Sequence, residues 1–95
     1  MLFRSMQEDH VSLGWHAARK LRKVIDALSQ VLAIELMTAA RAIDLRAPLT
    51  PGSRIATVIT ELRESVPGPG PDRFLHPEIQ AAVAFVRQRM TKGDL

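Results

Sequence analysis

The fold is decided by residues 11–46, which read VSLGWHAARKLRKVIDALSQVLAIELMTAARAIDLR. This stretch contains no proline and one glycine, Gly14, and residues of high helix propensity dominate it. It predicts one long helix, or two nearly continuous ones, with a length of about 50 Å. Apolar residues spaced three and four apart predict one buried stripe along it: Ala18, Leu21, Ile25, Leu28, Leu32, Leu36, Ala39 and Ile43.

A second apolar set widens this stripe until the middle of the helix is apolar almost all round: Val24, Val31 and Ile34. Such a helix is usually buried inside a multi-helix assembly. The rest of this 95-residue chain is too short to cover it. Partner chains, and therefore a homo-oligomer, are expected.

Two shorter helices are predicted after the long one. Pro48 ends the first helix, and Thr50 followed by Pro51 predicts an N-cap hydroxyl and a proline at the first helical position. This second helix is expected to continue to Val66, where Pro67 stops it. Its apolar positions keep helical spacing: Ile55, Val58, Ile59, Leu62 and Val66.

The segment 67–72 reads PGPGPD and predicts a loop, because prolines lack an N–H donor and glycines are costly to order. Pro77 then opens a third helix, and Gly93 follows its end. The apolar positions of this helix predict a second buried stripe: Ile79, Ala82, Val83, Val86 and Met90. With no strand pattern in the sequence, the predicted fold class is all-α, one long helix followed by two shorter ones.

Composition excludes several classes of protein. The 95 residues contain 13 basic and 10 acidic side chains, a net charge of +3, and neither cysteine nor tyrosine. The lack of cysteine excludes disulfide frameworks, zinc ribbons and thiol nucleophiles. No apolar run is long enough to span a membrane and no signal peptide precedes the helix, so a cytoplasmic chain without a membrane partner is expected.

One basic cluster raises the question of nucleic-acid binding: Arg19, Lys20, Arg22 and Lys23. Four cations in five residues can contact phosphates. However, Leu21 interrupts the cluster, no aromatic residue interleaves it, and Asp26 is spaced to pair with it along the helix. A solvated or interface-facing helix surface is therefore favoured, with no nucleic-acid partner. Among nearby residues, Trp15 is expected to pack a helix junction and Met37 to lie in the core.

The densest ionisable group is Gln7-Glu8-Asp9-His10. Ser5-Met6-Gln7-Glu8 fits a capping box, in which Ser5 caps the helix and Glu8 reaches back to it. Acid–base chemistry is an alternative, but consecutive helical side chains point in different directions and cannot converge on one metal ion. His10 and His16 are six apart and do not share a helix face, so no metal site is predicted.

The run Gln7-Glu8-Asp9-His10-Val11-Ser12, followed by Leu13-Gly14, resembles a signature of histidine ammonia-lyases. Residues 17–20 and 31–46 resemble the long core helix of these enzymes, and 72–75 with 77–79 resemble their closing segment. The resemblance covers residues 7–95, the C-terminal helical part of such an enzyme. Residues 1–6 form an atypical lead-in.

This resemblance implies the lyase reaction of histidine catabolism, in which L-histidine gives trans-urocanate and ammonia. It also implies a methylidene-imidazolone prosthetic group, formed from an Ala-Ser-Gly segment, and a homotetramer whose active sites combine several subunits. Carried over by position, Glu8 would bind the substrate imidazole and Gln7 would belong to the polar network around the prosthetic group. A carboxylate can accept a hydrogen bond from an imidazole N–H and stabilise its cationic form.

Two features of the family are missing from these residues. No Ala-Ser-Gly triplet occurs, and there is no tyrosine to match the family's catalytic tyrosines. The catalytic set is therefore incomplete, and the chain alone is expected to be inactive. The sequence leaves two interpretations open, namely a C-terminal fragment of a histidine ammonia-lyase or a stand-alone helical module that self-associates without catalysis.

Overall fold

The computed structural model describes the backbone of residues 2–93 and the side chains of residues 13–93. Three helices follow one another: α1 (Leu2–Leu45), α2 (Ser53–Leu62) and α3 (His76–Lys92). The described part of the chain contains no strand. The predicted all-α class, with one long helix before two shorter ones, is confirmed.

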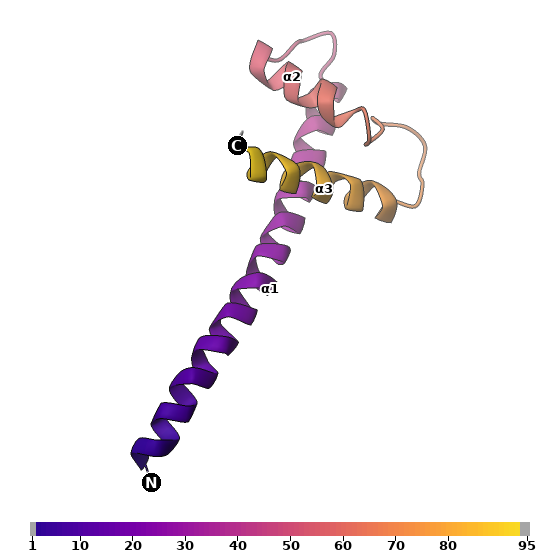
Figure 1. The fold of residues 1–95 in the computed structure, drawn as a ribbon. Helices are drawn as coiled ribbons and strands as arrows, with labels where there is room; N and C mark the ends of the chain where they lie inside the picture. Colours follow the sequence, from indigo (N-terminus) through magenta and orange to yellow (C-terminus); the bar gives the residue numbers. More distant parts are fainter. Residues whose placement is uncertain (1, 94–95) are drawn as a thin grey trace.

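Helix α1 is continuous and dominates the shape of the molecule (Figure 1). Its 44 residues correspond to about 66 Å, which accounts for most of the 70 Å long dimension. The helix begins at Leu2 and includes Ser5, so Ser5 is not an N-cap residue. The capping-box interpretation of Ser5 and Glu8 is therefore wrong, because the helix extends further toward the N-terminus than the sequence signal indicated.

Helix α2 is shorter than predicted at both ends. Gly52, not Thr50, is its N-cap residue, and no side chain caps the helix. The first backbone bond of this end runs from the N–H of Ala56 to the Gly52 carbonyl at 2.9 Å. At the other end the helix stops at Leu62, and a turn leads to Val66, whose N–H still bonds to the Leu62 carbonyl at 2.9 Å.

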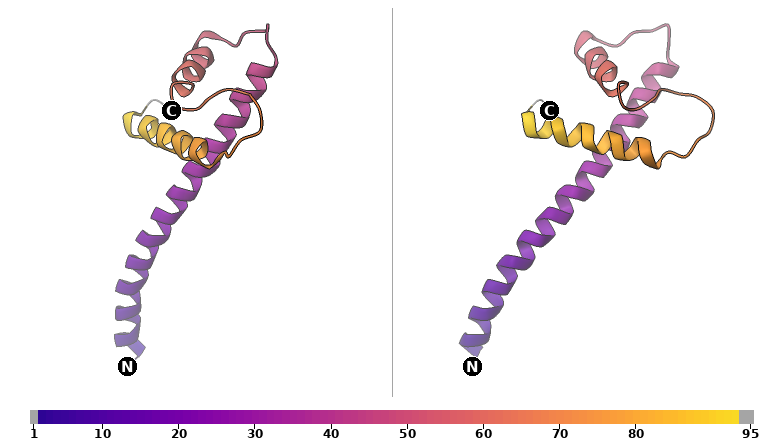
Figure 2. Two further views of the ribbon diagram at one scale, coloured as in Figure 1. Left: turned by 90° about the vertical axis from the view of Figure 1, so that its right-hand side faces the viewer. Right: turned by 45° about the vertical axis from the view of Figure 1, so that its right-hand side comes forward.

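Helix α3 begins and ends close to the predicted signals. Pro77 lies in its first turn, where a missing N–H costs nothing. Gly93 is the C-cap residue with a left-handed φ of 72°, and its N–H donates to the carbonyl groups of Arg89 and Met90. The helix crosses α1 on the C-terminal half of that helix, while the N-terminal half projects away from the rest of the molecule (Figure 2).

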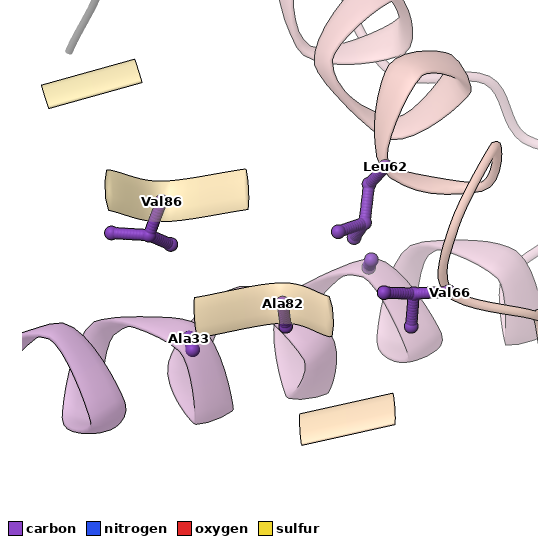
Figure 3. Packing of buried hydrophobic residues seen from close by; sticks show 6 residues of the cluster. Ala33, Leu62, Val66, Ala82 and Val86 are labelled. Carbon is purple, nitrogen blue, oxygen red and sulfur yellow. The ribbon is translucent and has the colours of Figure 1, made fainter. Parts of the chain in front are cut away.

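The core lies where α1, α3 and the end of α2 meet (Figure 3). Six apolar residues are buried there: Ala33, Ala40, Leu62, Val66, Ala82 and Val86. Ser29 is also buried, and its hydroxyl donates to the Ile25 carbonyl at 2.9 Å. The buried positions of α1 are thus small residues, which let the backbone of α3 approach closely.

The large apolar residues of α1 were predicted to be its buried stripe, and for the positions that precede Ser29 this is wrong. Leu21, Ile25 and Leu28 are 59%, 41% and 47% exposed, whereas Leu32 and Leu36 are partly buried beside the core. The periodicity identifies residues that favour burial, but α3 covers only the face and the length of α1 that it reaches. Any group that packs against the projecting half must therefore belong to another chain or lie outside residues 13–93 of this one.

Other predictions of burial have mixed outcomes. Met37 packs against the core cluster, as predicted. Trp15 does not pack a helix junction, because it lies on the projecting part of α1 and is 63% exposed. Ile55 and Met90 are also exposed, at 50% and 41%. Within the described residues, no helix combines the length and the hydropathy that crossing a membrane requires.

Candidate functional site

The residues predicted to face the substrate and the prosthetic group, Glu8 and Gln7, lie in the first turns of α1. Their side chains are outside the described residues, so both roles remain predictions. Glu8 lies about 43 Å along the helix axis from Met37, which is beside the core. Any site that includes Glu8 is therefore remote from the polar groups at the folded end of the molecule.

The most elaborate polar network at the folded end joins Arg73 to Glu78. The guanidinium donates from Nε to Glu78 Oε2 at 2.7 Å and from Nη2 to Oε1 at 2.9 Å, and Nη2 also donates to the Gly68 carbonyl at 2.8 Å. Glu78 is buried in the first turn of α3. The hydrogen bonds from Arg73 lower the pKa of Glu78 against the opposing effect of burial, and they raise the pKa of Arg73.

A second network is built on Arg63, at the end of α2. Its Nη2 donates to Asp44 Oδ2 of α1 at 2.5 Å. Its Nη1 donates to the carbonyl groups of Val66 and Pro67 at 3.2 and 3.3 Å. Arg63 thus fixes the segment after α2 against the end of α1, and Arg73 holds the next carbonyl of the same segment.

These networks form one side of a cleft of about 220 Å³ between α1, the 63–75 segment and α3. We call it the Arg41 cleft. Its lining is mostly apolar but includes three arginines, one glutamate and one threonine. The lining residues are Ile34, Met37, Thr38, Arg41, Arg63, Val66, Pro67, Gly68, Pro69, Arg73, Leu75, Glu78 and Ile79.

The chemistry of the Arg41 cleft is that of binding. Arginine stays protonated at all physiological pH values, and Glu78 is engaged by Arg73 through both carboxylate oxygens. The Thr38 hydroxyl donates to the Ile34 carbonyl at 2.8 Å and can only accept from a ligand. These lining groups can hold an anion in place, but none is set up to exchange a proton with it.

The basic cluster at residues 19–23 is solvent-exposed, as predicted for a helix surface. The Arg19 guanidinium lies over the Trp15 ring, 5.4 Å from its centroid. The predicted pairing of Asp26 within its own helix is wrong, because Asp26 forms an ion pair with Arg87 of α3. The crossing of the two helices places Arg87 of α3 beside Asp26.

A further ion pair, between Glu61 and Arg89, joins α2 to α3. The Arg89 guanidinium also lies over the Phe85 ring, 5.0 Å from its centroid. Glu61 is half-buried, since it lies against α3. This pair ties the two short helices together.

Sequence reasoning did not identify any residue of the Arg41 cleft as functional. Arg63 pairs with a carboxylate 19 residues earlier, and Arg73 pairs with Glu78 across a helix start, so neither pair has a local spacing signal. A weak signal was available in the PGPGPD loop, because two glycines among prolines often permit close approach to the backbone. An added Cβ at Gly70 would lie 3.0 Å from Arg73 Nη1.

Comparisons with known proteins give the family context of this geometry. The profile described as aromatic amino acid lyase matches residues 2–64. The chain is similar to proteins named histidine ammonia-lyase from Streptomyces avermitilis and Streptomyces coelicolor, with 61% and 56% identity over 84 residues. It is also 50% identical over 80 residues to the protein of that name from Anaeromyxobacter sp. strain K. No solved structure matches the chain.

The match covers most of this chain but little of each relative. It includes 87% of the chain for the two Streptomyces proteins and 84% for the Anaeromyxobacter protein. The same alignments span 16% of the length of each relative. Most of each relative therefore has no counterpart in these 95 residues.

Proposed function

Because the chain belongs to the aromatic amino acid lyase family, we propose that it works as a segment of a histidine ammonia-lyase. The proposed reaction is the elimination of ammonia from L-histidine to give trans-urocanate, in the cytoplasm. The observation that supports it best is 61% identity to a histidine ammonia-lyase over 84 residues. The run QEDHVS at residues 7–12, on which the sequence resemblance rests, lies in the part that matches the lyase profile.

Within this proposal, Glu8 is the substrate-binding residue. Its carboxylate would accept a hydrogen bond from the imidazole N–H of histidine and would favour the cationic ring. A phenyl ring offers no such donor, so Glu8 would favour histidine over phenylalanine. Gln7, the preceding residue on α1, would contribute to the polar network around the prosthetic group.

The methylidene-imidazolone group of this family does not fit the residues of this chain. None of the serines lies in an Ala-Ser-Gly triplet. Ser29, the buried serine among residues 13–93, lies between Leu28 and Gln30 and donates its hydroxyl to the Ile25 carbonyl. The electrophile would therefore have to come from other residues. The isolated chain is expected to produce no urocanate.

The proposal is tested in a chimera, because the isolated chain lacks the electrophile. Residues 7–93 replace the aligned segment of the Streptomyces avermitilis enzyme, and urocanate formation is followed by its ultraviolet absorbance. Glu8→Gln is expected to lower kcat/KM for histidine by about a hundredfold, the range for a lost charge-assisted contact in a buried site. Glu35→Gln, an exposed glutamate on the same helix, is the matched control and is expected to leave activity unchanged. An active chimera in which Glu8→Gln has no effect would contradict the role of Glu8.

A second function, self-association without catalysis, is favoured by one observation. Six large apolar residues of α1 are 41–60% exposed, and they run from the projecting half to the level of the crossing with α3, where Ile34 also lines the Arg41 cleft: Leu21, Val24, Ile25, Leu28, Val31 and Ile34. We call them the α1 apolar surface. Exposed apolar patches of this kind mark interaction sites. An inactive chimera that still assembles as an oligomer would favour this function over the lyase segment.

A further inference from the structure

The Arg41 cleft has the features of a ligand site, and it is separate from the proposed lyase site. It lies between α1, the 63–75 segment and α3, whereas Glu8 lies about 43 Å further along α1. We propose that the cleft binds a small monocarboxylic acid with an apolar body, its carboxylate on Arg41 and its body against the apolar wall. This binding goes beyond the proposed lyase function and does not depend on it.

The size of the cleft sets the size of the ligand. A volume of about 220 Å³ is below the range of about 300–1,000 Å³ that is usual for drug-sized ligands. A compact ligand therefore suits this cleft better than a drug-sized one does.

The apolar wall selects the body of the ligand. Ile34 and Met37 of α1 face the cleft, and Val66, Leu75 and Ile79 close it from the other elements. Water against such a wall has few hydrogen-bonding partners, so its release by an apolar group is favourable. A sugar or another strongly hydrated body would lose hydrogen bonds there.

The balance of charges selects the head group. Arg63 is paired with Asp44, and Arg73 is paired with Glu78 through two hydrogen bonds. Among residues 13–93 no carboxylate forms an ion pair with Arg41, which lines the same cleft and is exposed to solvent. The cleft thus has one cation in excess. A single carboxylate matches this charge and the planar fork of a guanidinium.

Arg63 and Arg73 shape the cleft, but Asp44 and Glu78 already balance their charges. Their guanidinium groups are bound to backbone carbonyls of Val66, Pro67 and Gly68, so the segment that closes the cleft is fixed before a ligand arrives. A fixed wall lowers the entropic cost of binding. The same bonds leave Arg41 as the lining arginine that is free to turn toward a ligand.

The experiment uses the full 95-residue chain and a pair of probes that differ only in charge, cyclohexanecarboxylate and cyclohexanecarboxamide. Binding is followed through the backbone amide NMR signals of Thr38, Gly68 and Ile79. The acid is expected to shift these signals in a saturable way at millimolar concentration, and the amide is expected to bind at least about tenfold more weakly. Equal binding of acid and amide would overturn the proposal, and so would shifts confined to other residues.

Two variants and one further anion complete the test. Arg41→Gln is expected to weaken binding of the acid by about tenfold or more, while Arg54→Gln, an exposed arginine of α2 outside the cleft, leaves it unchanged. If Arg41→Gln binds the acid as well as the unaltered chain does, Arg41 is not the anchor. Inorganic phosphate that displaces the acid at equal concentration would show a general anion site and would contradict the selection of a carboxylate. The comparison of acid with amide on the unaltered chain decides the proposal even where a variant folds poorly.

Discussion

At the scale of single residues, two arginines organise the irregular segment between α2 and α3. Arg63 and Arg73 each bind one carboxylate from a helix and one or more carbonyl groups of residues 66–68. A guanidinium has five donors in a fixed plane, so one side chain can serve both a helix and a loop. The proline-rich segment offers few N–H donors of its own, and these side chains supply the missing hydrogen bonds.

Glu78→Gln tests one of these networks through its pH dependence. The Arg73 hydrogen bonds lower the pKa of Glu78 below its ordinary value of 4.5. A lowered pKa in the folded state stabilises the fold above the ordinary pKa, and this contribution is lost as the pH falls through the lowered value. We expect Glu78→Gln to lower the urea midpoint at pH 7 and to reduce its decline between about pH 5 and pH 3.

The matched control for this prediction is Glu64→Gln, because Glu64 is exposed and forms no ion pair among the described residues. Its urea midpoint should follow that of the unaltered chain at every pH. Parallel pH curves for Glu78→Gln and the unaltered chain would show that the pair with Arg73 contributes nothing to stability.

At the scale of elements, the contact of α1 with α3 depends on small residues. Ala33 of α1 is fully buried beside Ala82 and Val86 of α3 (Figure 3). Their short side chains leave no room for a larger one between the two backbones. The crossing also sets the ion pair of Asp26 with Arg87, which forms only where the two helices come close.

Ala33→Leu is expected to lower the free energy of unfolding by about 1–3 kcal/mol, because it overpacks this contact. Ala39→Leu, at an exposed position of the same helix, should change it by less than about 0.5 kcal/mol. Urea unfolding followed by helical circular dichroism measures both variants. Similar effects of the two substitutions would mean that α3 does not pack on the Ala33 face in solution.

The elements also show how far the sequence could predict the fold. Proline and glycine are local signals, so they placed the start of α3, its end at Gly93 and the loop before it. The same signals misplaced the start of α2, since Thr50 and Pro51 fit a cap motif but the helix begins at Ser53. The buried face of α1 could not be predicted from the sequence, because the burial of Ser29, Ala33 and Ala40 depends on where α3 crosses α1.

The two candidate sites, that of Gln7 and Glu8 and the Arg41 cleft, also differ in how far the sequence could predict them. Gln7 and Glu8 came from a contiguous run of residues, which sequence resemblance detects well. The Arg41 cleft combines side chains from α1, the 63–75 segment and α3, and its ion pairs have no common spacing. A pattern within one element cannot reveal a site that three elements assemble.

At the scale of the whole molecule, the core lies at one end and the N-terminal half of α1 projects away from it. Figure 2 shows the projecting half of α1 standing clear of the other two helices, and the α1 apolar surface extends from that half to the crossing with α3. Each of its side chains is already about half covered, so burying the rest would contribute about 1 kcal/mol apiece. Six such residues give association a strong driving force.

The chain is therefore expected to self-associate in solution, and Leu28→Glu should weaken this association by about tenfold or more, because it buries a charge in the interface. Gln30→Glu adds the same charge at an exposed position of the same helix, outside the α1 apolar surface, and should have little effect. Analytical ultracentrifugation over a range of concentrations compares the two variants. A monomeric unaltered chain, or equal effects of both substitutions, would show that this surface is not a self-association interface.

The length of the projecting half of α1 makes it a lever arm with its pivot at the crossing with α3. Glu8 lies about 32 Å from Ser29, the first buried residue within 13–45, so a tilt of about 5° at the pivot moves Glu8 by about 3 Å. That displacement equals the length of a hydrogen bond. The position of Glu8 relative to a ligand therefore depends on the rigidity of the α1–α3 contact and of any group that packs against the projecting half. A small rotation at this contact gives a larger displacement at Glu8.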